Sequence, residues 1–190
     1  MKRKLLIIFS LVLIAAALFG ICAGQASGET IPAETENTPA DAGRRIYFAA
    51  PLFSDAERAY NLKIVSVLES FGYEVFLPQR DGFLAPELEG LTETEITEKI
   101  FRKDTEEVLK ADILFFMLDG RIPDEGACVE LGIAYASGKR CYGFKSDARS
   151  VELGMDLNPM IRGCFRELFY NLDGEQLIEE LKAYLQDHEL

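Results

Sequence analysis

The feature that most constrains the fold is a regular alternation of short apolar runs with helical patterns. Residues 112–118, Asp-Ile-Leu-Phe-Phe-Met-Leu, are apolar after the first position. Such a strand is typical of a parallel sheet with helices on both faces. Other runs predict strands at 45–50, 74–77, 140–144 and 167–170, helices at 55–71, 92–110, 124–137 and 174–187, and a loop at 79–91. The sequence therefore predicts an α/β fold, a doubly wound (flavodoxin-like) parallel sheet of about five strands flanked by helices.

The N-terminus has a composition of its own. Lys2, Arg3 and Lys4 precede the apolar stretch 5–23, and Gly-Gln-Ala follows at 24–26. This order is typical of a secretory signal peptide, although the stretch also has roughly the length that spans a bilayer. We therefore expect residues 1–26 to be a signal peptide or an N-terminal membrane anchor. The protein would then be exported or membrane-anchored, with its body on the extracytoplasmic face, or cytoplasmic if the start codon is misassigned.

The next segment, 27–43, is polar, acidic and rich in Pro, Thr and Ala. We expect it to be a disordered acidic linker, which leaves 44–190 as the folded domain. The whole chain has a net charge of −12, and the segment 1–26 holds no acidic residue. A domain this acidic repels phosphate backbones, so no nucleic-acid partner is expected.

The chain has few of the side chains on which many catalytic sites depend. The one histidine, His188, stands two residues from the end, which excludes Ser-His-Asp and Cys-His catalysis and His-rich zinc sites. Cys128, Cys141 and Cys164 form no CxxC pair, and neither a dinucleotide nor a P-loop glycine motif is present. We therefore expect no metal site and no cofactor, with acid–base chemistry coming mainly from carboxylate, Tyr, Lys or Cys side chains.

Glu130 is the most unusual carboxylate in the expected helices. The segment 119–126 follows the third strand, where sites in such sheets lie, and leads into the helix that carries Glu130. The neighbours of Glu130 on its helix face are small or apolar, apart from a serine: Gly126, Ala127, Ile133, Ala134 and Ser137. A carboxylate there is costly unless it is paired or used. The alternatives are a rim acid paired with Lys or Arg and, for Asp124, a simple helix cap.

Three segments resemble the nucleoside 2-deoxyribosyltransferase family. They are Ile-Tyr-Phe-Ala-Ala-Pro-Leu-Phe-Ser at 46–54, Leu-Pro-Gln-Arg-Asp-Gly at 77–82 and Asp-Glu-Gly-Ala-Cys-Val-Glu-Leu-Gly at 124–132. The likeness runs from about 45 to 165, and the Asp-x-Gly-x-x-x-Glu-x-Gly element is its most specific part. The resemblance implies a glycosyltransferase that moves 2-deoxyribose between purine and pyrimidine bases through a covalent deoxyribosyl-glutamate intermediate. Its partners would be deoxynucleosides and free nucleobases.

The resemblance also implies roles for particular residues. Glu130 would be the nucleophile, Asp124 the acid that helps to protonate the base, Tyr47 the group that orients the nucleophile, and Asp104 a second carboxylate. The implied substrate-binding residues are Phe53, Gln79, Asp81, Gly126, Asn158 and Met160. Asn158 and Met160 would complete the sugar site of a neighbouring subunit, so the protein would be a homo-oligomer, a dimer or larger. Their alternative interpretation is a packing element of a loop.

Two other functions remain open at this point. If water outcompetes the acceptor base, the same residues make a hydrolase of N-glycosidic bonds in deoxynucleosides or deoxynucleoside monophosphates. Lys145, Arg149 or Arg80 could then bind a phosphate, or could simply be solvated surface residues. The third possibility is a non-catalytic nucleoside-binding domain, which has no need of a nucleophile.

Overall fold

The structure is a computed structural model that describes residues 44–83, 85–120, 122–148 and 157–190. The predicted signal peptide or anchor (1–26) and the predicted linker (27–43) lie outside these residues. Within the described ranges, no helix has both the length and the apolar character needed to cross a membrane.

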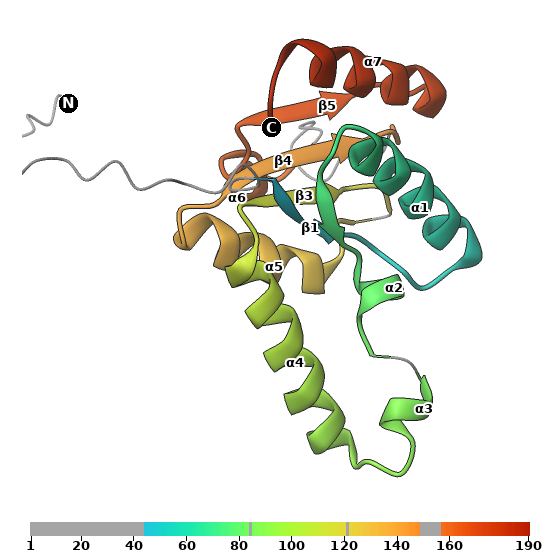
Figure 1. Cartoon of the computed structure of the whole chain (residues 1–190), viewed down its shortest axis with the longest axis vertical. Coiled ribbons are helices and arrows are strands. Elements are labelled where there is room, and N and C mark those ends of the chain that lie inside the picture. Colours follow the sequence, from blue (N-terminus) through green and yellow to red (C-terminus); the bar gives the residue numbers. More distant parts are fainter. Residues whose placement is uncertain (1–43, 84, 121, 149–156) are drawn as a thin grey trace, which may run out of the picture. The chain divides into compact units, whose positions relative to one another are not determined.

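A five-stranded sheet forms the centre of the domain, as predicted. Its strands lie in the order β2-β1-β3-β4-β5, and every neighbouring pair is parallel (Figure 1). The strands are β1 (Arg45–Ala49), β2 (Glu74–Phe76), β3 (Ile113–Met117), β4 (Arg140–Lys145) and β5 (Glu167–Tyr170). All five residues of β3 are buried, which accounts for its continuous apolar run.

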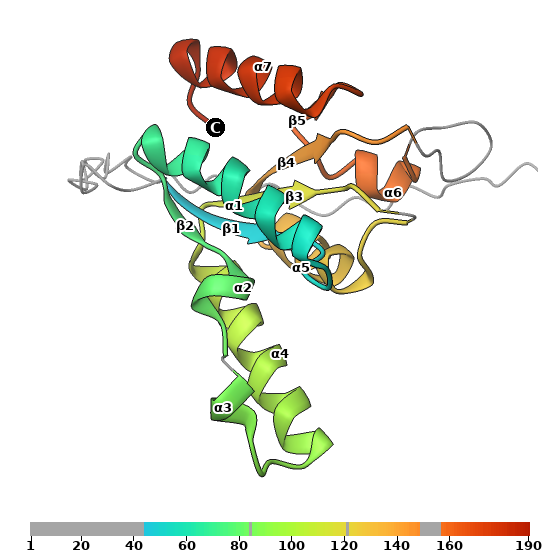
Figure 2. The same cartoon turned by 90° about the vertical axis from the view of Figure 1, so that its right-hand side faces the viewer.

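Helices cover both faces of this sheet. Buried side chains of α1 (Asp55–Ser70) and α7 (Gly174–Asp187) belong to one apolar cluster, and those of α4 (Glu93–Lys110) and α5 (Glu125–Ala136) belong to another. Figures 1 and 2 show these two pairs on opposite faces of the sheet. The structure therefore has the doubly wound architecture that the alternation predicts.

Strand β1 divides its side chains between the two faces. Ile46 and Phe48 belong to the cluster under α1 and α7, whereas Tyr47 and Ala49 belong to the cluster under α4 and α5. Successive side chains of a strand point to opposite faces, so this division follows from the backbone alone. Tyr47 is thereby directed towards the helix that carries Glu130.

The helix starts follow local sequence signals. Ser54 and Glu57 form a capping box at α1, and Thr92 and Glu95 form the predicted capping box at α4. The expected loop at 79–91 was wrong in part, because it contains the single-turn helices α2 (Pro78–Asp81) and α3 (Ala85–Leu88). Another short helix, α6 (Pro159–Arg162), also lacks a periodic signal. Proline stands at the first position of α2 and α6, where its fixed φ favours a helical turn.

Helix α4 is anchored to the domain by its C-terminal part. Its buried residues are Glu107 and Val108, while the N-terminal half extends away from the sheet beside α3 (Figure 2). Glu107 accepts hydrogen bonds from Arg45 at 2.7 Å, Lys110 at 3.0 Å and Lys103 at 3.3 Å. This buried carboxylate therefore joins the end of α4 to the start of β1.

Candidate active site

The centre of the site is a hydrogen bond between a strand and a helix. The hydroxyl of Tyr47, in the middle of β1, donates to Oε1 of Glu130 on α5 over 2.7 Å. Tyr47 is fully buried and its ring stacks on Phe76 with a centroid separation of 5.5 Å. Burial and this stacking leave the Tyr47 hydroxyl little freedom, so Tyr47 fixes the position of one carboxylate oxygen of Glu130.

Burial makes this carboxylate hard to ionise. It raises the pKa of Glu130 to about 7; the hydrogen bond from Tyr47 opposes this change, and the charges of Asp104 and Asp124 add to it. Burial also raises the pKa of Asp104 to about 6, against the effect of Lys103. The same causes, burial first and then the charge of Glu130, raise the pKa of the Tyr47 hydroxyl. Tyr47 therefore remains a protonated donor at every pH at which Glu130 ionises.

Glu130 opens onto a first cavity of about 310 Å³. Its lining residues come from the loop after β1, the α2–α3 segment and helices α4 and α5: Ala50, Leu52, Phe53, Pro78, Gly82, Phe83, Ile100, Asp104, Asp124 and Glu130. Three of them are carboxylates and the rest are apolar or glycine. Such a combination of apolar walls and a few convergent polar groups is typical of small-molecule sites.

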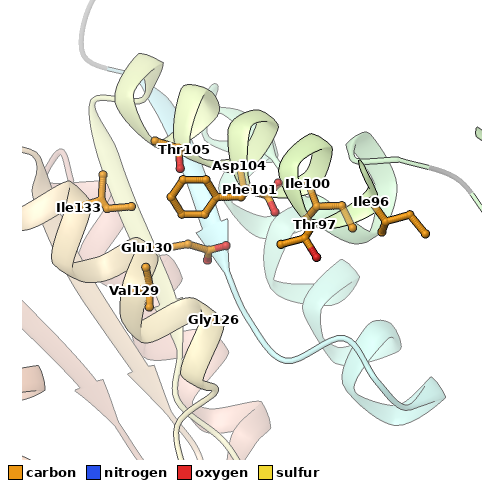
Figure 3. A pocket seen from close by; sticks show the side chains of 10 residues that line it. All are labelled: Ile96, Thr97, Ile100, Phe101, Asp104, Thr105, Gly126, Val129, Glu130 and Ile133. Carbon is orange, nitrogen blue, oxygen red and sulfur yellow. The ribbon is translucent and has the colours of Figure 1, made fainter. Parts of the chain in front are cut away.

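A second cavity of about 470 Å³ lies between α4 and α5 (Figure 3). It shares Ile100, Asp104 and Glu130 with the first cavity. Its remaining lining is mostly apolar: Ile96, Thr97, Phe101, Thr105, Gly126, Val129 and Ile133. Figure 3 shows Glu130 between the ring of Phe101 and the side chain of Val129. Glu130 is therefore accessible from two sides.

The structure places most of the predicted site residues together. Phe53, Asp104, Asp124 and Glu130 line the first cavity, and Gly126 lines the second. Asp124 is also the N-cap of α5, because its Oδ2 accepts from the Ala127 amide at 2.8 Å. The alternative of a rim ion pair for Glu130 is not supported, since no lysine or arginine of the described ranges lies within salt-bridge distance of it.

Gln79 and Asp81 lie outside both cavities, and their polar groups are used within the fold. The side-chain oxygen of Gln79 accepts from the buried Asn61, and its Nε2 donates to the carbonyl of Arg58, each over 2.9 Å. Asp81 accepts from the Leu77 amide at 2.8 Å. These bonds tie α2 to α1 and to the end of β2, so both residues support the cavity wall from behind.

Asn158 and Met160 also lie apart from the cavities, at α6. The side chain of Asn158 caps this short helix by accepting from the Met160 amide at 2.9 Å. The side chain of Met160 is 81% exposed, the largest exposed fraction of any large hydrophobic residue in the described ranges. Within the described part of one chain, Asn158 has a capping role and the carbonyl of Met160 accepts from the Cys164 thiol at 3.2 Å.

Two of the candidate phosphate ligands, Lys145 and Arg80, bond elsewhere and line neither cavity. Lys145 is buried and bonds to Asp147, while Arg80 pairs with Glu69 at 2.8 Å and with Asp81 at 2.9 Å. Arg149 lies outside the described residues. In the described parts of the chain, no group of three or more His, Cys, Asp or Glu side chains is arranged to hold a metal ion.

Sequence reasoning missed the apolar walls of the two cavities. Phe83 stands in the segment expected to be a loop, and Ile96, Ile100 and Phe101 stand on α4. The signal for α4 was available, because these residues form an apolar stripe on an otherwise charged helix. Phe83 had no comparable signal, since one aromatic residue in a loop indicates nothing by itself.

Comparisons with known proteins give a matching family model and several similar solved structures. The family model described as nucleoside 2-deoxyribosyltransferase matches residues 46–175. A conserved protein from Enterococcus faecalis V583 is similar in structure (TM-score 0.59, 28% identity, 73% of this chain and 97% of that chain). A 2-deoxyribosyltransferase from Bacillus psychrosaccharolyticus is also similar (TM-score 0.59, 27% identity, 74% and 91%).

A third solved structure shares the fold at lower identity. A CMP N-glycosidase from Clostridium botulinum has a TM-score of 0.52 at 16% identity, over 74% of this chain and 98% of that chain. The comparison with curated proteins gave no match.

Proposed function

The chain belongs to the nucleoside 2-deoxyribosyltransferase family, and we propose from this that it transfers 2-deoxyribose from one purine or pyrimidine base to another. Glu130 is the nucleophile in this proposal. The observation that carries it is the 2.7 Å hydrogen bond by which the buried Tyr47 holds Glu130 at a cavity that Asp104 and Asp124 also line.

The chemistry of the reaction suits these groups. As the bond from C1′ to the base nitrogen breaks, positive charge develops at C1′ and a carboxylate oxygen of Glu130 bonds to it. The electron pair of the broken bond leaves with the base, and a proton from Asp124 makes the base a better leaving group. A second base then attacks C1′ through a ring nitrogen, its N–H proton returns to Asp124, and the bond to Glu130 breaks, which releases the carboxylate. Two displacements on opposite faces retain the anomeric configuration.

The burial of Glu130 supports its role as a nucleophile. A poorly solvated carboxylate with a pKa of about 7 is more reactive towards carbon than a hydrated one, and part of it is ionised near neutral pH. Tyr47 bonds only one of its oxygens, Oε1. The other oxygen, Oε2, is the atom we assign to the bond with C1′.

The cavity lining favours uncharged nucleosides over nucleoside monophosphates. Neither lysine nor arginine occurs among the described residues that line the two cavities, whereas Asp104, Asp124 and Glu130 do. Three carboxylates repel a phosphate dianion. We therefore rank the hydrolysis of deoxynucleoside monophosphates second to the transfer between free bases.

We extend the proposal to a homo-oligomer in which Asn158 and Met160 face a neighbouring subunit. Met160 supports this arrangement because its large apolar side chain is 81% exposed among the described residues and is therefore available to a neighbouring subunit. The α4–α5 cavity, with its apolar wall beside Glu130, provides a surface of matching character.

The test is a reaction with thymidine and adenine, followed by chromatography, on the wild type, Glu130→Ala and Glu125→Ala. Glu125 is an exposed acid on the first turn of the same helix and serves as the matched control. Transfer predicts thymine and deoxyadenosine from the wild type and the control, with loss of at least about 10³-fold in Glu130→Ala.

Two other outcomes would contradict the proposal. Thymine and free sugar without deoxyadenosine would identify a hydrolase. Saturable binding of nucleosides without any product, unchanged by Glu130→Ala, would identify a binding domain.

A further inference from the structure

The first cavity is lined by a second aromatic side chain, Phe83, which lies in the segment that was expected to be a loop. Phe83 lies between α2 and α3 and lines the cavity together with Phe53, which comes from the loop after β1. We propose that Phe83 is the second aromatic wall of the base subsite and that Lys99 holds it in position. This inference rests on the proposed function and specifies the part of the site that selects among bases.

The polar and apolar parts of the cavity define where the base lies. The cavity's only charged lining groups in the described residues are Asp104, Asp124 and Glu130, and the remaining walls are apolar or glycine. The reacting C1′ and the sugar hydroxyls must be within reach of the carboxylates. The flat face of the base therefore lies along the apolar walls, where only Phe53 and Phe83 provide rings on which it can stack.

The backbone before Phe83 is built for a close turn. The Gly82 amide donates to the Pro78 carbonyl over 2.9 Å, at the end of α2. A Cβ atom at Gly82 would stand 2.4 Å from that carbonyl oxygen, which no side chain tolerates without a shift of the backbone. Glycine thus lets the chain close tightly over Pro78, and the next residue, Phe83, enters the cavity.

Lys99 fixes the ring from outside the cavity. Its ammonium nitrogen lies 4.6 Å from the centroid of the Phe83 ring, within the range of a cation–π contact. The same nitrogen donates to the carbonyl of Glu87 in α3 over 3.4 Å. Lys99 therefore connects α4 both to Phe83 and to Glu87 of α3, and it covers one face of the Phe83 ring. The other face is the one we assign to the base.

The proposal predicts kinetics that depend on the base. Phe83→Leu keeps an apolar side chain and removes the ring, so the KM for the acceptor base rises by roughly 5- to 150-fold, more for purines than for pyrimidines. Lys99→Met keeps most of the side-chain stem and removes the charge, so the KM for the acceptor base rises by a smaller factor. Lys99→Arg keeps the charge and restores the wild-type KM. Lys182→Met is the matched control, because Lys182 is an exposed lysine on α7.

The chain has no tryptophan, which allows a direct measurement of base binding. Phe83→Trp creates a single tryptophan in the proposed wall, which can be excited at wavelengths that the seven tyrosines do not absorb, and adenine stacked on it quenches the emission. Phe101→Trp places the fluorophore in the second cavity, and Tyr135→Trp places it on an exposed part of α5. Saturable quenching at position 83, and none at the other two, is the expected result.

The outcomes separate this inference from the proposed function. If the wild type shows no turnover but adenine quenches the Phe83→Trp variant, the transferase is overturned and the base subsite stays in place. If the wild type is active and Phe83→Leu leaves the KM for the acceptor base unchanged, the assignment of Phe83 to the base subsite is overturned. Quenching at position 101 instead of 83 would also overturn it, because the base would then lie between α4 and α5.

Discussion

The Tyr47 hydroxyl and the Glu130 carboxylate, 83 residues apart in the sequence, meet over 2.7 Å between the sheet and α5. The hydrogen bond lowers the pKa of Glu130, which burial alone would raise further. Among the described residues, it is the contact that lowers this pKa and so keeps the carboxylate ionisable near neutral pH.

Removal of that contact is expected to move the pH profile upwards. Glu130 acts in its ionised form, so kcat/KM of the wild type rises with pH through about 7, the pKa of Glu130. Tyr47→Phe deletes the donor, raises this pKa and lowers kcat at pH 7 by about 10- to 100-fold. Steady-state kinetics between pH 5 and 9 check this, with Tyr135→Phe as control. An unshifted profile would contradict the role of Tyr47.

Asp104→Asn is expected to shift the profile in the opposite direction. Burial raises the pKa of Glu130 most, but the charge of Asp104 raises it too, and asparagine lacks that charge. The acidic limb of kcat/KM should therefore move to lower pH than in the wild type. Asp112→Asn, at a carboxylate before β3 that bonds the Arg45 amide, is a control away from the cavities. A profile that moves upwards would contradict the coupling.

Glu130 is also expected to reduce the stability of the fold at high pH. Its folded pKa of about 7 exceeds the ordinary value of 4.5, so the stability that the protonated form provides at low pH is lost as the pH rises through 7. Glu130→Gln has no charge to bury. Urea unfolding should find it equal to the wild type at pH 4 and about 1–3 kcal/mol more stable at pH 8. Equal stability at both values would disprove the burial cost.

Glu107 is expected to have the opposite effect on the pH dependence of stability, because it stabilises the fold when it is ionised. Burial would raise its pKa, but hydrogen bonds from Lys110, Arg45 and Lys103 lower it overall. The stability it contributes is therefore present above its ordinary pKa and lost as the pH falls through the lowered one. Glu107→Gln should cost about 2–3 kcal/mol at pH 7 and much less at pH 3. Urea unfolding at the two pH values, beside the exposed Glu179→Gln, tests this.

A shared site predicts that two inactive variants restore each other. Glu130→Ala lacks the proposed nucleophile, and Asn158→Ala with Met160→Ala lacks the groups proposed for the neighbour's site. Mixed at equal amounts after subunit exchange, they should regain about a quarter of the wild-type activity if the unit is a dimer. Sedimentation of the wild type gives the oligomeric state. No recovery from fully exchanged subunits would place each site within one chain.

The order of strands and long helices could be predicted from the sequence because each leaves a periodic or continuous apolar pattern. The run at 112–118 and the capping box at Thr92 and Glu95 are examples, and both are present in the structure. Helices α2, α3 and α6 have four residues each, too few to show a period, so they were missed.

The site was predictable where a residue's role depends on its place in an element. Tyr47 and Glu130 meet because β1 and α5 fix their directions. Gln79 and Asp81 illustrate the limit, since their positions in the chain fit a substrate contact but their side chains bond to α1 and the end of β2. Whether a polar side chain bonds within the fold or faces the substrate depends on tertiary contacts, which the local sequence pattern does not show.

The shape of α4 implies that its two ends differ in how readily they open. Its buried residues stand in the last turns, and its first turns depend on the capping box and on contacts with α3. Amide hydrogens of the first turns therefore exchange with solvent through cheap local fraying, whereas those near Val108 wait for global unfolding. Ile96 and Ile100 belong to the part that frays. Under the proposed function, the cavity wall at Ile96 and Ile100 is the part that moves when one base replaces another, while the hydrogen bond between Tyr47 and Glu130 stays in place.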